Sequence, residues 1–328
     1  DLLHTYSTCM NQIRRLKHSW TSMPEKNRRQ QLSRTLCNKA GVLLNTSRDR
    51  FRPPGAHDFW KKYFAELKQH LTRDCHKVFR YNDNKACAQH CVYWKPALWD
   101  WLDVELWRDR ILVAYERAKE LPEWSRWYSI GVQWEPVGAP PKFKLADGET
   151  KISAMGLQKC LILNVLRAAM GILVINIRRF VDYGAGTTLV ARLLHLGGFQ
   201  GEYIIYDFFP MCIMQEFFLR IVGIPALVAP SDSPITRFPH GVLLTPSITK
   251  MQSTIQLGEG GGGRSVFFAS YSLSESPFEV RESFLAVMSD FTDYLITFAC
   301  AGMTKWEEPV PKKDRWGGNF GYFRDAIK

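Results

Sequence analysis

The sequence predicts an α/β fold in its second half, where a mostly parallel sheet carries helices on both faces and follows a helical N-terminal region. Three observations support this prediction. After residue 150, short β-branched runs alternate with helical patterns, a glycine-containing turn joins one run directly to a helix, and the next run ends in an acidic residue. Strands that alternate with helices are typical of parallel sheets with crossover connections.

Five runs are predicted to form strands, at residues 179–183, 203–206, 226–228, 266–270 and 294–298. Helices are predicted near residues 188–196, 211–221 and 278–291, and an apolar helix at residues 153–170 precedes the first strand. The domain boundary is therefore placed near residue 150. Residues 1–150 are expected to form a basic and then tryptophan-rich helical region, and residues 151–328 to form the α/β domain.

Positive charge is concentrated near the N-terminus. The first 80 residues carry 17 basic and 6 acidic side chains, so the whole formal charge of +11 lies there. Clustered positive charge favours contact with polyanions, whether RNA, phosphates or an acidic membrane surface, and so predicts contact with RNA or a protein complex through residues 1–80; a solvated helical face is the alternative. The most apolar stretch, at residues 161–175, contains Asn164 and Arg167 and is shorter than the roughly 20 residues of a bilayer span, so no transmembrane segment is expected.

The eight cysteines have no regular spacing, which indicates reduced thiols and an intracellular compartment, cytoplasmic or organellar. Cys87, His90 and Cys91 could share one helical face and, with Cys75 or His76, form a four-ligand zinc site. That spacing matches no standard zinc module, so buried thiols are the preferred interpretation.

Seven tryptophans lie between residues 94 and 134, interleaved with acidic side chains. Flat apolar rings can stack on sugars or nucleobases, but large aromatic side chains are more often part of a core. The neighbouring carboxylates argue against a nucleic-acid surface there. A buried core is preferred, and a sugar-binding face is the alternative.

A glycine turn carries the strongest functional signal. The first predicted strand runs through Asp182, Gly184 and Gly186 directly into a helix that begins near Thr188. The two glycines allow the backbone to pass close to a bound nucleoside, and the helix directs its amide groups and positive dipole end toward the ligand. This strand, turn and helix therefore predict a cofactor-binding turn.

The second strand supports the same interpretation, because it ends at Asp207, 21 positions beyond Gly186. Doubly wound folds place a carboxylate at this spacing to accept hydrogen bonds from ribose hydroxyls. A dinucleotide-binding dehydrogenase is the main alternative, but its third glycine would fall at Leu189, which argues against pyrophosphate binding. A purely structural turn is the other alternative.

Several segments resemble a family of sugar O-methyltransferases, which are class I enzymes that depend on S-adenosylmethionine and have a Rossmann-like fold. The resemblance covers residues 153–306 and is carried by Val-Asp-Tyr-Gly-Ala-Gly at 181–186, Tyr-Ile-Ile-Tyr-Asp-Phe-Phe-Pro at 203–210, Gln-Glu-Phe-Phe-Leu at 215–219 and, above all, Ser-Leu-Ser-Glu-Ser-Pro at 272–277. It implies S-adenosylmethionine as cofactor and a small sugar, glycan or related hydroxylated molecule as acceptor.

The resemblance also implies a donor site. Asp182, Gly184 and Gly186 would lie along the methionine moiety of the donor, and Asp207 would hold its ribose. Asp232, after the third predicted strand, would lie near the adenine.

For the acceptor, the resemblance implies a place after the fourth predicted strand. Ser272, Ser274 and Glu275 follow that strand and would stand at the carboxyl edge of the sheet, where the acceptor hydroxyl must arrive. Methyl transfer requires removal of the hydroxyl proton, so a positioned carboxylate or histidine is the expected base. Glu275 is the first candidate and His240 the second.

The sequence departs from the family pattern at three places. Thr188 stands where a third glycine is usual, one extra residue separates Asp207 from Pro210, and only about 30 residues follow the fifth predicted strand. The domain is therefore expected to be truncated or eroded at its C-terminal end, and the chain, which begins at Asp1, to be processed or part of something longer. The alternative function is a catalytically inactive, methyltransferase-like scaffold subunit of a large ribonucleoprotein or membrane complex. An RNA methyltransferase ranks last, because no base-binding motif follows the fourth strand.

Overall fold

The computed structural model describes residues 25–46, 124–128, 142–144, 151–153, 173–233, 237–257, 264–270, 278–289 and 293–298. It also describes isolated positions between 65 and 75, 112 and 120, and 156 and 163, and residues 171, 272 and 276.

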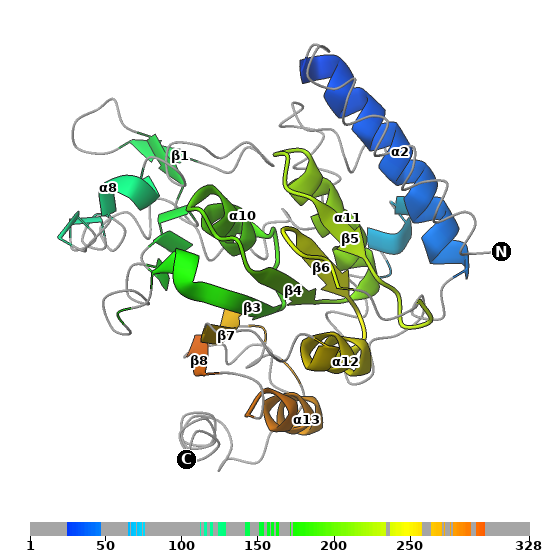
Figure 1. Ribbon diagram of the computed structural model, residues 1–328. Helices are drawn as coiled ribbons and strands as arrows, with labels where there is room; N and C mark the ends of the chain where they lie inside the picture. The colour runs from blue at the N-terminus through cyan, green and yellow to red at the C-terminus, as the bar shows by residue number, and fades with distance from the viewer. Residues whose placement is uncertain are drawn as a thin grey trace, which may run out of the picture.

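A six-stranded sheet forms the centre of the described structure (Figure 1). Its strands are β3 (Ile177–Tyr183), β4 (Glu202–Tyr206), β5 (Ala226–Val228), β6 (Val242–Thr245), β7 (Arg264–Ser270) and β8 (Tyr294–Phe298). They lie in the order β5-β6-β4-β3-β7-β8, and all neighbouring pairs are parallel. This arrangement confirms the predicted α/β fold and is consistent with a Rossmann-like sheet.

Helices cover both faces of the sheet. α10 (Leu189–Leu196) and α11 (Phe209–Arg220) pack on the face that contains Phe180 and Tyr203. α12 (Ile248–Leu257) and α13 (Phe278–Ser289) pack on the opposite face, against Val181 and Phe267. Adjacent strand residues point to opposite faces, so every central strand contributes to two cores. The result is the three-layer arrangement in Figure 1.

Most element positions agree with the sequence prediction. β5 and β8 have the predicted bounds, while β3, β4, β7 and the helices α10, α11 and α13 differ from the prediction by a few residues at their ends. The prediction missed β6 and α12. Pro239 and Pro246 bracket the four-residue β6, and proline-rich surroundings indicate loops, while the five Thr, Ser and Gln residues of α12 weaken its helical pattern.

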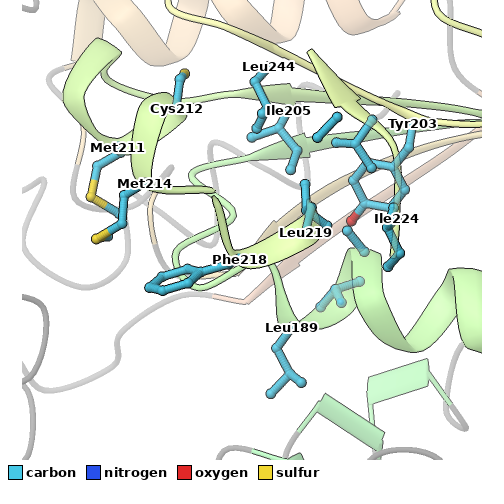
Figure 2. Close-up of a cluster of buried hydrophobic side chains, with 14 of the residues drawn as sticks. Leu189, Tyr203, Ile205, Met211, Cys212, Met214, Phe218, Leu219, Ile224 and Leu244 are labelled. Carbon is cyan, nitrogen blue, oxygen red and sulfur yellow. The ribbon is translucent and has the colours of Figure 1, made fainter. Parts of the chain in front are cut away.

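The larger core lies between the sheet and α11. Figure 2 shows Leu219 and Ile224 beside Tyr203 and Ile205, with Leu244 of β6 nearby. All five side chains are buried. Each fully buried side chain of this size contributes about 1.5–3 kcal/mol relative to its exposed state, so this cluster is a principal source of stability for the sheet.

α11 is buried on its outer side as well. All residues from 209 to 219 are buried, and the apolar sequence Phe-Pro-Met-Cys-Ile-Met continues around the helix. A helix that is apolar all round requires cover on both sides. α2 (Glu25–Thr46) supplies the outer cover through buried residues that include Leu36, Ala40 and Leu43.

A buried ion pair fixes α2 to α11. Lys39 Nζ lies 2.7 Å from Glu216 Oε1 and 2.6 Å from Oε2, and Arg220 Nε donates to the same Oε1 at 2.9 Å. Lys39 and Glu216 are both buried. Because a buried carboxylate is costly without partners, the pair specifies how the two helices meet.

One cysteine expectation was wrong. Cys37 of α2 and Cys75 form a disulfide, with 5.5 Å between their Cα atoms. The two residues are 38 positions apart in the chain, so the pairing depends on tertiary packing that spacing alone does not reveal. Cys160 and Cys212 are buried thiols, in line with the expectation for those two residues.

The disulfide removes Cys75 from the ligands considered for zinc. Cys87, His90 and Cys91 lie outside the described residues, so the structure does not test a site built on them. Within the described part of the chain, no group of three or more His, Cys, Asp or Glu side chains could hold a metal ion. Among these same residues, no helix is both long and apolar enough to span a bilayer.

The region around the predicted domain boundary contains a small antiparallel pair, β1 (Lys142–Lys144) with β2 (Lys151–Ser153). The sequence predicted a helical region up to residue 150 and a helix at residues 153–170, so this strand pair was not expected; described helical positions begin at residue 156. Before the pair, α8 (Trp124–Trp127) buries both of its tryptophans, and Trp127 lies close to Gly197. These two tryptophans are core residues; the other five of the group lie outside the described residues.

We expect Lys39→Ala to lower the free energy of unfolding by about 2–3 kcal/mol, because Glu216 would stay buried with Arg220 as its one charged partner among the described residues. Urea unfolding measures the change. The control is Lys119→Ala, which breaks the exposed pair with Glu116 and should cost less than about 1 kcal/mol. Equal losses for the two variants would show that the buried α2–α11 ion pair stabilises the fold no more than an exposed ion pair does.

Candidate functional site

The candidate site lies where β3 and β4 end. After β3, the chain forms β4, β5 and β6 on one side of β3, and it then forms β7 on the other side. The direction of winding therefore switches between β3 and β7. Open α/β sheets bind ligands beyond the carboxyl ends of their strands at such a switch point. Asp182 is the penultimate residue of β3, and Asp207 follows β4 directly.

The turn after β3 has the backbone predicted from its glycines. Gly184 and Gly186 have φ angles of 70° and 57°, in a region that residues other than glycine rarely adopt. The Gly184 N–H donates to the carbonyl oxygen of Tyr206 at 2.8 Å, which joins the turn to the end of β4. The turn then leads into α10, as predicted.

Thr188, just before α10, has a φ of 60°. A β-branched residue in this left-handed region carries strain. Its side chain is fully buried and makes no capping hydrogen bond to the helix. The position at which the family pattern has glycine therefore has a glycine-like backbone, but in this chain it carries a side chain.

Asp207 is a buried carboxylate held by three donors. Its Oδ1 accepts from the Phe208 N–H at 2.8 Å, its Oδ2 accepts from Gln215 Nε2 at 2.6 Å, and the Gly186 N–H is the third donor. Burial raises the pKa of Asp207 to about 7, although the three donors act in the opposite direction. The carboxyl group is therefore poised between its neutral and charged forms at neutral pH.

Asp182 is the second buried carboxyl group of the site. Its Oδ2 accepts from the Tyr203 hydroxyl at 2.8 Å, whereas its Oδ1 is buried and has no hydrogen-bond partner among the residues that the structure describes. Burial raises the pKa of Asp182 to about 7, and the Tyr203 hydrogen bond and the Lys159 charge oppose that rise. Burial in turn lowers the pKa of Lys159 to about 8, while Asp182 opposes that fall. Burial therefore moves the pKa values of both groups toward neutrality.

The segment after β7 closes against the glycine turn. Ser272 Oγ donates to the Gly184 carbonyl at 2.9 Å, and a Cβ atom at Gly184 would collide with the Ser272 side chain. Ser276 Oγ donates to the Ser272 carbonyl at 2.9 Å and lies 2.7 Å from the Tyr183 hydroxyl. Glycine at 184 is thus required by the close approach of these two segments as well as by its φ angle.

The other predicted site residues lie in different places. Asp232 is exposed in the turn after β5, and β6 separates β5 from β4, so Asp232 lies one strand further from Asp207 than expected. His240 is exposed and precedes β6, at the amino edge of the sheet. That edge lies about 10 Å or more from the carboxyl edge, which does not suit the role of acceptor base. Ser274 and Glu275 lie outside the described residues.

Three residues of the site were not predicted: Lys159, Tyr203 and Gln215. Lys159 lies on a helical segment that precedes β3, and no local spacing links it to Asp182. Tyr203 lies within a predicted strand, and nothing in the local sequence distinguishes it from other strand residues. Gln215 offers the clearest signal, since it is a single amide within an apolar helix, and buried polar side chains in such helices generally have a partner.

Comparison of the chain with protein-family models, with curated proteins and with solved structures found no match. The fold defines the chain as an α/β protein whose parallel sheet is consistent with the Rossmann-like type. The resemblance to sugar O-methyltransferases remains a prediction from the sequence.

We expect Thr188→Gly to have a free energy of unfolding about 0.5–1 kcal/mol higher than Thr188→Ala. Both variants remove the buried side chain, so their difference isolates the cost of the left-handed backbone. Gly223→Ala provides a matched control, because Gly223 has a φ of 82° and open space around the added Cβ. That variant should be destabilised by a similar amount. An alanine variant at position 188 as stable as the glycine variant would contradict the assigned backbone.

Proposed function

We propose that this chain binds S-adenosylmethionine at the carboxyl ends of β3 and β4 and transfers its methyl group to a hydroxyl of a sugar or related small molecule. One observation carries the proposal: the buried carboxylate of Asp207 is joined to the glycine turn at the switch point of a parallel sheet. This is where Rossmann-like folds bind nucleosides.

The residues of the site suit an adenine nucleoside with a positively charged sulfonium. Asp207 is the proposed acceptor for ribose hydroxyls, and Gly186 lets the backbone approach the ligand without side-chain obstruction. The unpartnered Oδ1 of Asp182 supplies a further buried acceptor beside the turn. When bound, S-adenosylmethionine supplies an activated methyl group.

The proposed acceptor site is the segment after β7. Ser272 lies against Gly184, so this segment reaches the donor side of the sheet. Glu275, three positions further along the chain, is the proposed base that receives the proton of the acceptor hydroxyl. A carboxylate in this segment would lie beside the bound donor, whereas His240 lies at the opposite edge of the sheet.

A second candidate function is a methyltransferase-like scaffold subunit without activity, in contact with RNA or a protein complex through the basic residues 1–80. The observation that favours it concerns Asp207. A carboxylate has about four acceptor positions, and three protein donors already use this one. The buried Thr188 side chain and the contact of Ser272 with Gly184 also fill space around the turn.

Calorimetric titration of S-adenosylmethionine and S-adenosylhomocysteine tests the proposal. We expect dissociation constants in the micromolar range for the wild type and a loss of at least about tenfold in Asp207→Ala, because a charged acceptor of the ribose is removed. Glu282→Ala, which removes an exposed carboxylate on α13, is the control and should bind as the wild type does.

Either outcome separates the two candidates. Binding that depends on Asp207 would support a working donor site and justify a screen of sugar acceptors. A folded wild-type protein that binds neither nucleoside would exclude the enzyme and favour the scaffold.

A further inference from the structure

Gln215 links the two parts of the candidate donor site. Its side-chain Nε2 donates to Asp207 Oδ2 at 2.6 Å and to the carbonyl oxygen of Gly186 at 3.0 Å. One amide group therefore joins the acid that follows β4 to the turn that follows β3. Gln215 is fully buried, and no described residue forms a hydrogen bond with its Oε1.

These two hydrogen bonds restrict how Asp207 can be presented to a ligand. Oδ1 accepts from the neighbouring Phe208 N–H, so the bond from Gln215 to Oδ2 fixes the remaining rotation of the carboxylate. The bond to Gly186 also holds the left-handed turn at a set distance from that carboxylate. Groups that fix the orientation of a ligand-binding side chain commonly change affinity when they are removed.

α11 is itself held in place at the next residue. Glu216 accepts hydrogen bonds from Lys39 of α2 and from Arg220, and all of residues 209–219 are buried. Gln215 therefore projects from a helix that is fixed on both sides. A side chain on such a support can preorganise a site more precisely than one on a loop.

We propose that Gln215 is a positioning residue of the donor site, which orients the Asp207 carboxylate and the glycine turn for an adenine nucleoside. This inference rests on the proposed function. Its role is to act through Asp207, so its removal should change the protonation of that carboxylate as well as the affinity for the ligand.

The sign of the protonation effect follows from the contacts. The amide donor of Gln215 stabilises the charged carboxylate, and the N–H groups of Phe208 and Gly186 act in the same direction. Within the described part of the chain, the ionisable groups that interact with Asp207 are Asp182 and Tyr183 of β3. Loss of the amide donor leaves these groups in place and raises the pKa of Asp207 above about 7, so less of the carboxylate is ionised at neutral pH.

The test compares wild type with Gln215→Leu, which has similar volume and no donor. Carbon-13 NMR titration of the free protein, with Asp207→Asn to assign the signal, follows the pKa of Asp207. We expect it to rise by about one unit. Affinity for S-adenosylhomocysteine is measured between pH 6 and 9. We expect about tenfold weaker binding at pH 7 and a recovery toward wild-type affinity at pH 9.

Two further variants keep the test decisive. Met214→Leu changes a buried neighbour on α11 without touching Asp207, and it should leave both the pKa and the pH dependence of binding unchanged. Gln215→Glu preserves the size of the side chain but adds a second carboxyl group beside Asp207. The protonated form of this added group can donate to Asp207 as the amide does, so the variant keeps a donor that the leucine variant lacks. It should bind more weakly than wild type at pH 7.

The outcomes are distinguishable. A wild type that binds and a Gln215→Leu variant with the same affinity at every pH would overturn the positioning role and leave the proposed function intact. A loss of affinity that is equal at all pH values, with no change in the pKa of Asp207, would show a structural role only and would also overturn it. Failure of the wild type itself to bind would overturn both proposals.

Discussion

Burial of the Asp207 carboxyl group between a glycine turn and a helix is the constraint on which the rest of the site depends. The polar group is taken out of water at the end of β4, so it needs donors from the surrounding chain. The turn after β3 supplies the Gly186 amide, and α11 supplies Gln215. These interactions bring β3, β4 and α11 together at one edge of the sheet. They also keep the pKa of Asp207 near neutrality, at about 7.

The same constraint links the N-terminal helix α2 to the candidate site through α11. α11 carries Gln215 toward the sheet and Glu216 toward α2, so one helix serves both interfaces. α2 covers the apolar outer side of α11 and pairs Lys39 with Glu216. The disulfide between Cys37 and Cys75 then ties α2 to the next described helical segment. In an isolated α/β domain, α11 would expose an unusually apolar surface. The cover that α2 provides makes α11 part of the core.

The sequence predicted what depends on local pattern. It predicted the strand, turn and helix around Gly184 and Gly186, the acidic residue at the end of β4, and the bounds of β5 and β8. It did not predict β6, since two prolines bracket that strand and local rules indicate a loop. Missing that strand in turn misplaced Asp232 relative to β4. The contacts made by Gln215, and the Cys37–Cys75 pairing, join distant parts of the chain, and spacing along one sequence carries no information about them.

The central claim is that Asp207 and the glycine turn form a nucleoside site, and a crystal structure with S-adenosylhomocysteine tests it most directly. The account predicts a ribose hydroxyl within about 3.2 Å of an Asp207 carboxylate oxygen, with the nucleoside beside Gly184 and Gly186 at the carboxyl edge of the sheet. A nucleoside bound elsewhere, with Asp207 contacted only by Gln215, Phe208 and Gly186, would contradict it.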